Sequence, residues 1–110
     1  SDPVGIHFDL LLEDGLGCRT WRMQDVPVLD GPALEVISLP IHKLEWLDRS
    51  AGVVSGDRGW AKRVFQGWFI GELSIDLNDP VDVALYQSHM EGMLHIHKKF
   101  CKLRSFSALN

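Results

Sequence analysis

The sequence has little of what marks a secreted or membrane-spanning protein. Among its 110 residues there are only two cysteines, Cys18 and Cys101, too few for the disulfide framework of a small secreted domain. No apolar run approaches the roughly 20 residues of a membrane-spanning helix, and no signal peptide is visible. We therefore expect a cytoplasmic protein without a membrane segment, whose two cysteines are reduced or, alternatively, form one disulfide.

An excess of positive charge is also missing. The formal net charge is −4, so binding to nucleic acid would need a local basic patch. Basic residues do cluster in two places, at residues 58–63 and 98–104. The motifs of a P-loop (G-x-x-x-x-G-K-[ST]), a serine nucleophile elbow (G-x-S-x-G) and a zinc protease (H-E-x-x-H) are absent. Enzymes built on these three motifs are therefore excluded.

The chain does have a globular composition and a strong alternation of apolar and polar residues. Apolar residues make up 45% and charged residues 24%, which suits one domain over residues 1–110. Alternation with period two predicts strands. The first two strands would form a hairpin over residues 6–23. Pro40 is expected to end the third strand, and residues 48–59 are expected to be largely loop. The expected strands cover residues 6–13, 18–23, 33–39, 60–69, 71–77, 81–86, 93–100 and 102–109.

Seven or eight short strands without a long amphipathic helix predict a mostly β fold. We expect a small closed or nearly closed antiparallel β-barrel with short flanking helical or loop segments, with a sandwich as the alternative. A barrel also removes exposed sheet edges. A helix beginning at Asp79 is the alternative for residues 81–86, but the two valines there favour a strand.

His7 and Asp9 are the first candidate site. Two residues apart on a strand, they point the same way, roughly 6 to 7 Å apart along the backbone, so that an imidazole and a carboxylate can converge on one ion. This pair of donors suits Mn, Zn or Fe. Glu13 shares the same face and is a possible supporting residue. The alternative is a solvated strand face on which Asp9 simply accepts a hydrogen bond.

Three other histidines, His42, His95 and His97, are further candidates. His42 follows Pro40 at the end of an expected strand, where a lone histidine is more often structural than catalytic. His95 and His97 form a second pair two residues apart, opposite the apolar Leu94 and Ile96. An exposed strand face is the favoured interpretation of this pair, because the neighbouring lysines raise the local potential and disfavour a bound cation.

The glycine-rich stretch SGDRGWAKR, residues 55–63, is a candidate phosphate-binding segment. Its backbone N–H groups, with Arg58, Lys62 and Arg63, could cradle a phosphate. Trp60 and Trp68 could stack on a base. The alternative is an ordinary charged surface with tryptophans in the core.

Taken in order, several stretches resemble one known family. These are HFDLLLEDG, RTWRM, a proline-bearing loop, IHKLEWLD and GVVSGDRGWAKRV. They are similar to the 3′-phosphoesterase domain of bacterial DNA ligase D, and most of all to its short stand-alone relatives, often labelled DNA polymerase ligase-like. The family pattern runs H-W-D-L-x-L-E-x-G, T-W-R-L, H-R-x-x-Y-L and P-V-S-G-x-R-G. The likeness covers residues 5–68, whereas the C-terminal half matches only in its strand rhythm.

The resemblance implies a compact β-barrel that processes DNA 3′ ends. Ligase D phosphoesterase domains bind manganese, trim a 3′-terminal ribonucleotide and remove a 3′-phosphate, leaving a 3′-hydroxyl for end joining. By resemblance, His7 and Asp9 match two metal ligands, with Mn expected and Zn as the alternative. His42 matches the catalytic histidine that contacts the scissile phosphate. The implied partners are DNA 3′ ends, or RNA-tipped DNA, and a ligase or polymerase encoded separately.

Three positions depart from the ligase D pattern. Ser1 stands where a third metal-binding histidine lies, six residues before His7. Leu11 replaces a phosphate-contacting arginine, and leucine cannot supply a charge-assisted hydrogen bond. Trp46 replaces a tyrosine and keeps an aromatic ring with an N–H donor. Three hypotheses follow: an active 3′-phosphoesterase, a catalytically degenerate relative that binds nucleic acid or a repair complex, and a metal-binding barrel acting on a small phosphoester.

Overall fold

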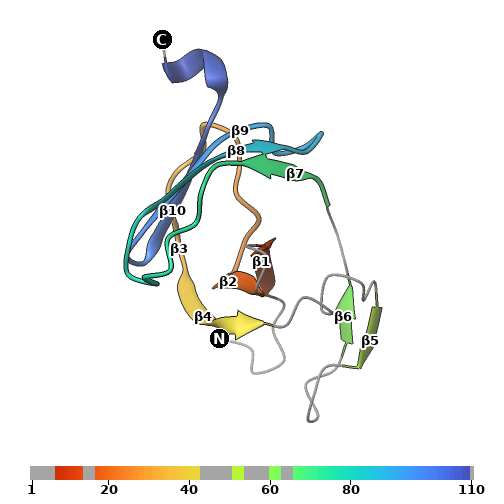
Figure 1. Ribbon diagram of the computed structural model, residues 1–110. Helices are drawn as coiled ribbons and strands as arrows, with labels where there is room; N and C mark the ends of the chain where they lie inside the picture. Colours follow the sequence, from red (N-terminus) through yellow and green to blue (C-terminus); the bar gives the residue numbers. More distant parts are fainter. Residues whose placement is uncertain (1–6, 14–16, 43–50, 54–59, 63–65, 110) are drawn as a thin grey trace.

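The computed structural model describes residues 7–13, 17–42, 51–53, 60–62 and 66–109, and the fold is stated for these residues. They contain ten strands, all paired antiparallel, and one short 3₁₀ helix, η2 (Phe106–Leu109) (Figure 1). The predicted mostly β fold class is confirmed. No helix in this part of the chain is long and apolar enough to cross a membrane.

The first sheet has three strands in the order β1-β2-β4. β1 (Phe8–Glu13) and β2 (Cys18–Met23) form the hairpin predicted over residues 6–23. β4 (Ile37–His42) pairs with the other side of β2. The alternation predicted for β1 also holds, since Phe8, Leu10 and Leu12 contribute to the core whereas Asp9 and Glu13 are exposed.

The second sheet has five strands in the order β3-β10-β9-β8-β7, and a third sheet pairs β5 with β6. The prediction of a strand over residues 81–86, rather than a helix, is confirmed by β8. The strands are β3 (Leu34–Glu35), β5 (Ala51–Val53), β6 (Trp60–Lys62), β7 (Trp68–Ile70), β8 (Val81–Tyr86), β9 (Gly92–His97) and β10 (Phe100–Arg104).

One apolar cluster joins the two larger sheets. The first sheet contributes Leu12, Trp21 and Met23, and the second contributes alternate residues of β8, β9 and β10. The chain passes from the second sheet to the first at Val36, which lies between β3 and β4 and is itself buried in the cluster. Burying these side chains is the main stabilising term of such a fold. The members of the second sheet are Val81, Val83, Leu85, Leu94, Ile96, Cys101 and Leu103.

Pro40 does not end a strand, contrary to the prediction. The predicted strand over residues 33–39 is interrupted at Val36 instead, and β4 continues through Pro40 to His42. Pro40 lacks an N–H donor, which a regular ladder would require, but the pairing of β4 with β2 shifts register in this part of the strand. Prolines within sheets occur at such bulges and on edge strands.

The prediction of a strand over residues 71–77 is wrong. Side-chain hydrogen bonds hold this segment in turns: Ser74 Oγ accepts from the Asp76 N–H (3.1 Å) and Asp76 Oδ1 accepts from the Asn78 N–H (2.9 Å). Gly71 begins the segment with φ of 143°, outside the strand region. Serine and aspartate compete with sheet ladders in this way.

Three further boundaries differ from the sequence prediction. The strand expected over residues 102–109 is β10, which begins at Phe100 and ends at Arg104, and residues 106–109 form the 3₁₀ helix η2. Residues 51–53, expected to be loop, form β5, because pairing with β6 satisfies their backbone groups in a way that composition does not reveal. Of the strand expected over residues 60–69, the described residues show β6 and the start of β7, which continues to Ile70, and residues 63–65 lie outside the described residues. The closed barrel stays a prediction, because the pairings between described residues form three separate sheets and none of these pairings closes a ring.

Candidate functional site

His7 and Asp9 lie on the exposed side of β1. His7 directly precedes β1 and is exposed. Asp9 is also exposed, and Phe8 between them packs against the core. Leu11 occupies the next position of this face and is half-buried, and Glu13 is exposed at the end of the strand. The alternation of β1 therefore places all three polar candidates on one side, with an apolar side chain among them.

Arg22 is the direct partner of Asp9. The two residues are opposite one another in the β1–β2 ladder. Arg22 Nε donates to Asp9 Oδ1 at 2.9 Å, and Nη2 donates to Oδ2 at 3.2 Å, which is the two-pronged geometry of a strong arginine–carboxylate pair. The hydrogen bond to Asp9 raises the pKa of Arg22 above its ordinary value, against a smaller lowering by burial.

His42 lies at the end of β4, and its backbone position follows from the register. It is opposite Cys18, which in turn is opposite Glu13. Neighbouring strands are about 4.8 Å apart and residues rise about 3.3 Å each, so the Cα atoms of His42 and Asp9 are on the order of 16 Å apart in a flat sheet. His42 and Asp9 are therefore on the same sheet without being direct neighbours, and a bound group would have to bridge them.

The other predicted site residues are placed only in part. Lys62 is the last residue of β6, and only its backbone is described. Arg58, Arg63 and Trp46 lie outside the described residues. The proposed phosphate-binding segment is therefore an untested prediction.

The donors on β1 fit a divalent ion in kind. Imidazole and carboxylate are common ligands of Mn and Zn. An ionised carboxylate has about four lone-pair positions, so the two hydrogen bonds from Arg22 leave room for a metal on Asp9, and hydrogen-bonded carboxylate ligands are usual in metal sites. Within the described residues, no three His, Cys, Asp or Glu side chains are grouped to hold a metal. A third protein ligand is thus missing from that part of the chain.

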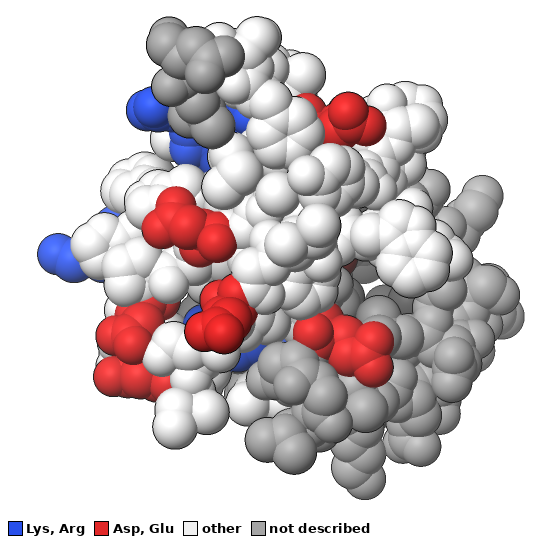
Figure 2. All heavy atoms as spheres, turned by 45° about the horizontal axis from the view of Figure 1, so that its top comes forward, with Lys and Arg blue, Asp and Glu red and all other residues white. Residues whose placement is uncertain are grey.

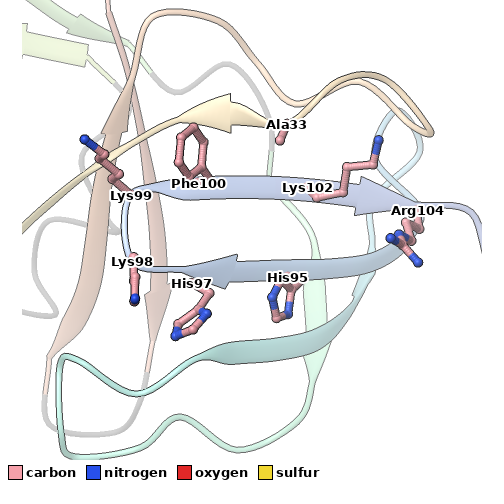
Figure 3. A pocket seen from close by; sticks show the side chains of 8 residues that line it. All are labelled: Ala33, His95, His97, Lys98, Lys99, Phe100, Lys102 and Arg104. Atoms are coloured by element: carbon pink, nitrogen blue, oxygen red, sulfur yellow. The ribbon is translucent and has the colours of Figure 1, made fainter.

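A second polar site lies on the other sheet. A shallow groove of about 470 Å³ runs over the outer face of β9 and β10 (Figure 3). Its charged and histidine side chains are His95, His97, Lys98, Lys99, Lys102 and Arg104. The prediction that His95 and His97 lie on an exposed strand face is confirmed. His95 Nδ1 is 2.6 Å from Asp82 Oδ1 on β8, a hydrogen bond that orients the His95 ring.

Two features of these sites are not among the sequence predictions: the role of Arg22 beside Asp9, and the position of the basic cluster at residues 98–104 next to the histidines of β9. The signal for Arg22 was available: a hairpin that pairs Glu13 with Cys18 necessarily pairs Asp9 with Arg22. The groove could also have been predicted. If β9 and β10 form a hairpin, alternation puts His95, His97, Lys102 and Arg104 on one face.

No family model matches this chain, and no curated protein or solved structure matches it significantly. The resemblance to ligase D phosphoesterase domains therefore rests on the ordered motifs of the sequence alone.

Proposed function

We propose that this protein is a relative of the 3′-phosphoesterase domain of DNA ligase D and that it acts at DNA 3′ ends. The observation that carries the proposal is the shared exposed face of β1, where His7 and Asp9 stand two residues apart and clear of the core. This is the placement that two metal ligands on a strand require. The ordered motifs over residues 5–68 supply the substrate class.

In the active form of the proposal, His7 and Asp9 hold a divalent ion, Mn²⁺ or alternatively Zn²⁺. Such an ion, when bound, polarises phosphoryl oxygens and lowers the pKa of water. His42 contacts the scissile phosphate or moves a proton near neutral pH. Arg22 orients the Asp9 carboxylate through its two hydrogen bonds. Glu13 and Trp46 support the site, and Arg58, Lys62 and Arg63 contact the DNA backbone.

A second candidate is a relative that binds nucleic acid or a repair complex without catalysis. The bidentate pair between Arg22 and Asp9 favours it, because the guanidinium already neutralises the carboxylate that an ion would use. Leu11 favours it as well, because it is half-buried and carries no charge where ligase D has an arginine.

An end-processing assay separates the two candidates. A primer-template with a 3′-phosphate is incubated with and without Mn²⁺, using the wild type, His42→Ala and His89→Ala. The active form predicts a 3′-hydroxyl product that requires Mn²⁺, disappears in His42→Ala and persists in His89→Ala, a histidine of the exposed β8–β9 turn. Binding of the same DNA without any metal-dependent product would support the degenerate relative.

We also propose how the fold closes, where the protein works and which partners it has. The fold would be a closed or nearly closed barrel. The protein would work in the cytoplasm, where thiols such as Cys18 and Cys101 stay reduced. Its partners would be DNA 3′ ends and a separately encoded ligase or polymerase.

A further inference from the structure

The outer face of the five-stranded sheet combines cations with exposed aromatic rings. Alternate residues of β8, β9 and β10 point into the core, so the residues between them all face outward. The basic groove occupies the β9–β10 end of this face, and Figure 3 shows its side chains rising from these two strands and from the turn between them. Among the residues that the structure describes, no aspartate or glutamate lines the groove.

The groove concentrates positive charge in a protein of net charge −4. It holds four of the eleven lysines and arginines of the chain, namely Lys98, Lys99, Lys102 and Arg104. Among the described residues, none of these four forms a salt bridge with a carboxylate. Lys102 Nζ donates to the carbonyl oxygen of Gly31, a neutral partner, and Asp30 is the carboxylate that interacts electrostatically with Lys102 and Arg104. The groove thus attracts anions although the whole protein is acidic.

Acidic side chains are present around the groove but do not fill it. Glu35 is opposite Phe100 in the β3–β10 ladder, Asp82 is engaged with His95, and Asp30 lies near Lys102 and Arg104. On the face seen in Figure 2, acidic side chains form separate patches, whereas the visible lysines and arginines lie mainly toward the left edge. A polyanion would therefore bind at the groove rather than at these acidic patches.

Aromatic rings stand on the same outer face. Phe100 lies in the groove itself and is 48% exposed. At the other end of the sheet, Trp68 on β7 is 80% exposed and lies directly opposite Tyr86 on β8, which is 40% exposed. Tyr86 and Asp82 are both on the outward face of β8, so Trp68 and the groove share one surface. A tryptophan side chain this exposed can stack on a planar ligand.

The turn of the groove contains an unusual backbone conformation. Lys98 has a φ of 56°, in the left-handed region that favours glycine, and it begins the two-residue connection between His97 and Phe100. A lysine there costs about 1 kcal/mol relative to an unstrained conformation. Two-residue hairpin connections commonly need a positive φ. This conformation places Lys98 beside the groove.

We infer that the outer face of β7–β10 binds single-stranded nucleic acid, with phosphates along the basic groove and bases stacked on Phe100 and Trp68. Cations along the backbone and rings under the bases are the two elements of such platforms. A duplex fits less well, because its bases are already stacked and cannot use the rings. The face is on the order of 20 Å long, from the ~3.3 Å rise per strand residue, so it can contact several nucleotides of one strand. The inference does not rest on the proposed catalytic role, which uses the other sheet.

The test is a titration of the full chain followed by fluorescence anisotropy. The probes are fluorescein-labelled 12-nucleotide oligothymidylate, oligouridylate of the same length, and a 12-base-pair DNA duplex. The variants are Phe100→Ala, Trp68→Ala, Lys98→Gly and Lys98→Arg. Gln24→Glu serves as a matched control, because it changes the net charge by one unit at an exposed position beyond β2 on the other sheet.

We expect both single strands to bind more tightly than the duplex. Phe100→Ala and Trp68→Ala should each weaken binding at least about fivefold. Lys98→Gly should weaken it and reduce the slope of log K against log salt by about 0.7, the value for one phosphate contact on a single strand. Lys98→Arg and Gln24→Glu should stay close to wild type. A preference for one sugar would identify the natural strand as DNA or RNA.

Three results would overturn the inference. One is no binding of either single strand at low salt. Another is tighter binding of the duplex than of the single strands. The third is unchanged binding in Phe100→Ala, Trp68→Ala and Lys98→Gly together. Thermal midpoints of all variants separate lost binding from lost folding, and none of these positions is in the buried core. Because the readout is binding and not turnover, failure here leaves the 3′-phosphoesterase proposal untouched.

Discussion

Arg22 and Asp9 face each other across the β1–β2 hairpin, and the guanidinium holds both oxygens of the carboxylate, at 2.9 and 3.2 Å. The residue that the sequence resemblance assigns to a metal is thus also half of an ion pair. The two side chains keep 41% and 27% of their surface exposed, for Arg22 and Asp9 respectively. Pairs this accessible contribute little to stability, so the pair can be altered to study the site.

Removing the cation tests whether Asp9 can hold a metal. Arg22→Gln should lower the free energy of unfolding by no more than about 1 kcal/mol. It should also tighten Mn²⁺ binding, because a positive charge beside the carboxylate is lost. Manganese titration by electron paramagnetic resonance measures the affinity, with His7→Ala as the variant that should abolish binding. Equal, non-saturable Mn²⁺ binding by wild type, Arg22→Gln and His7→Ala would remove this pair from the metal site.

The strained turn gives a prediction about stability. Lys98→Gly relieves a left-handed φ, which offsets the extra backbone freedom that glycine brings to the unfolded chain. The variant should therefore be at least as stable as wild type. Lys99→Gly is the matched control, because Lys99 has no positive φ, and it should lose roughly 0.5 to 1 kcal/mol. Urea unfolding measures both, and equal losses in the two variants would contradict the assigned backbone geometry.

Gly92 is required by the close approach of β9 to its neighbours. A β-carbon at this position would overlap the carbonyl oxygen of Arg104 and lie 2.9 Å from Leu29 Cδ1. Since the carbonyl belongs to the backbone of β10, the two strands would have to separate. Gly92→Ala should lower the free energy of unfolding by about 2 kcal/mol or more, as other severe core strains do. A denaturation midpoint equal to that of the wild type would show that the hairpin can adjust.

The lowered pKa of Asp30 makes part of the free energy of unfolding depend on pH. A side-chain hydrogen bond from Ser105, and next the bond from the Ser105 N–H at 3.0 Å, lower the pKa of Asp30 below its ordinary value. A lowered folded-state pKa stabilises the fold above the ordinary pKa of about 4, and this stabilisation is lost as the pH falls through the folded-state pKa. The stability difference between wild type and Asp30→Ala should therefore shrink as the pH falls below the ordinary pKa of about 4. Urea midpoints across this range measure it, and a difference that stays constant with pH would refute the assignment.

Local patterning predicted the hairpins and the faces of the strands well. The alternation in β1, β8 and β9 is strong, because one face of each must meet the shared core, and the residues on that face are the ones the pattern identifies. The exposed placement of His7, Asp9 and the His95–His97 pair follows from the same alternation. For these elements, burial alone determines the structure.

The misassigned segments depend on interactions that no periodicity reveals. Residues 71–77 alternate like a strand, yet Ser74 and Asp76 form local hydrogen bonds that hold turns instead. Pro40 is tolerated because β4 shifts its register against β2, a property of the partner strand and not of the proline. Predicting the Arg22–Asp9 pair requires the register of β1 against β2. Predicting the basic groove requires knowing that β9 and β10 are paired.

The two cysteines have a practical consequence. Both are buried and neither forms a disulfide. Cys18 begins β2 in one sheet and Cys101 lies in β10 of the other. Burial raises the pKa of the Cys101 thiol to about 11, so a thiol reagent can attack it only after the strand opens. Each of these two sheets therefore contains one buried thiol whose labelling rate measures how often that sheet opens. In Cys18→Ser and Cys101→Ser variants, the labelling rate of the remaining thiol would report whether the two sheets open as one cooperative unit or separately.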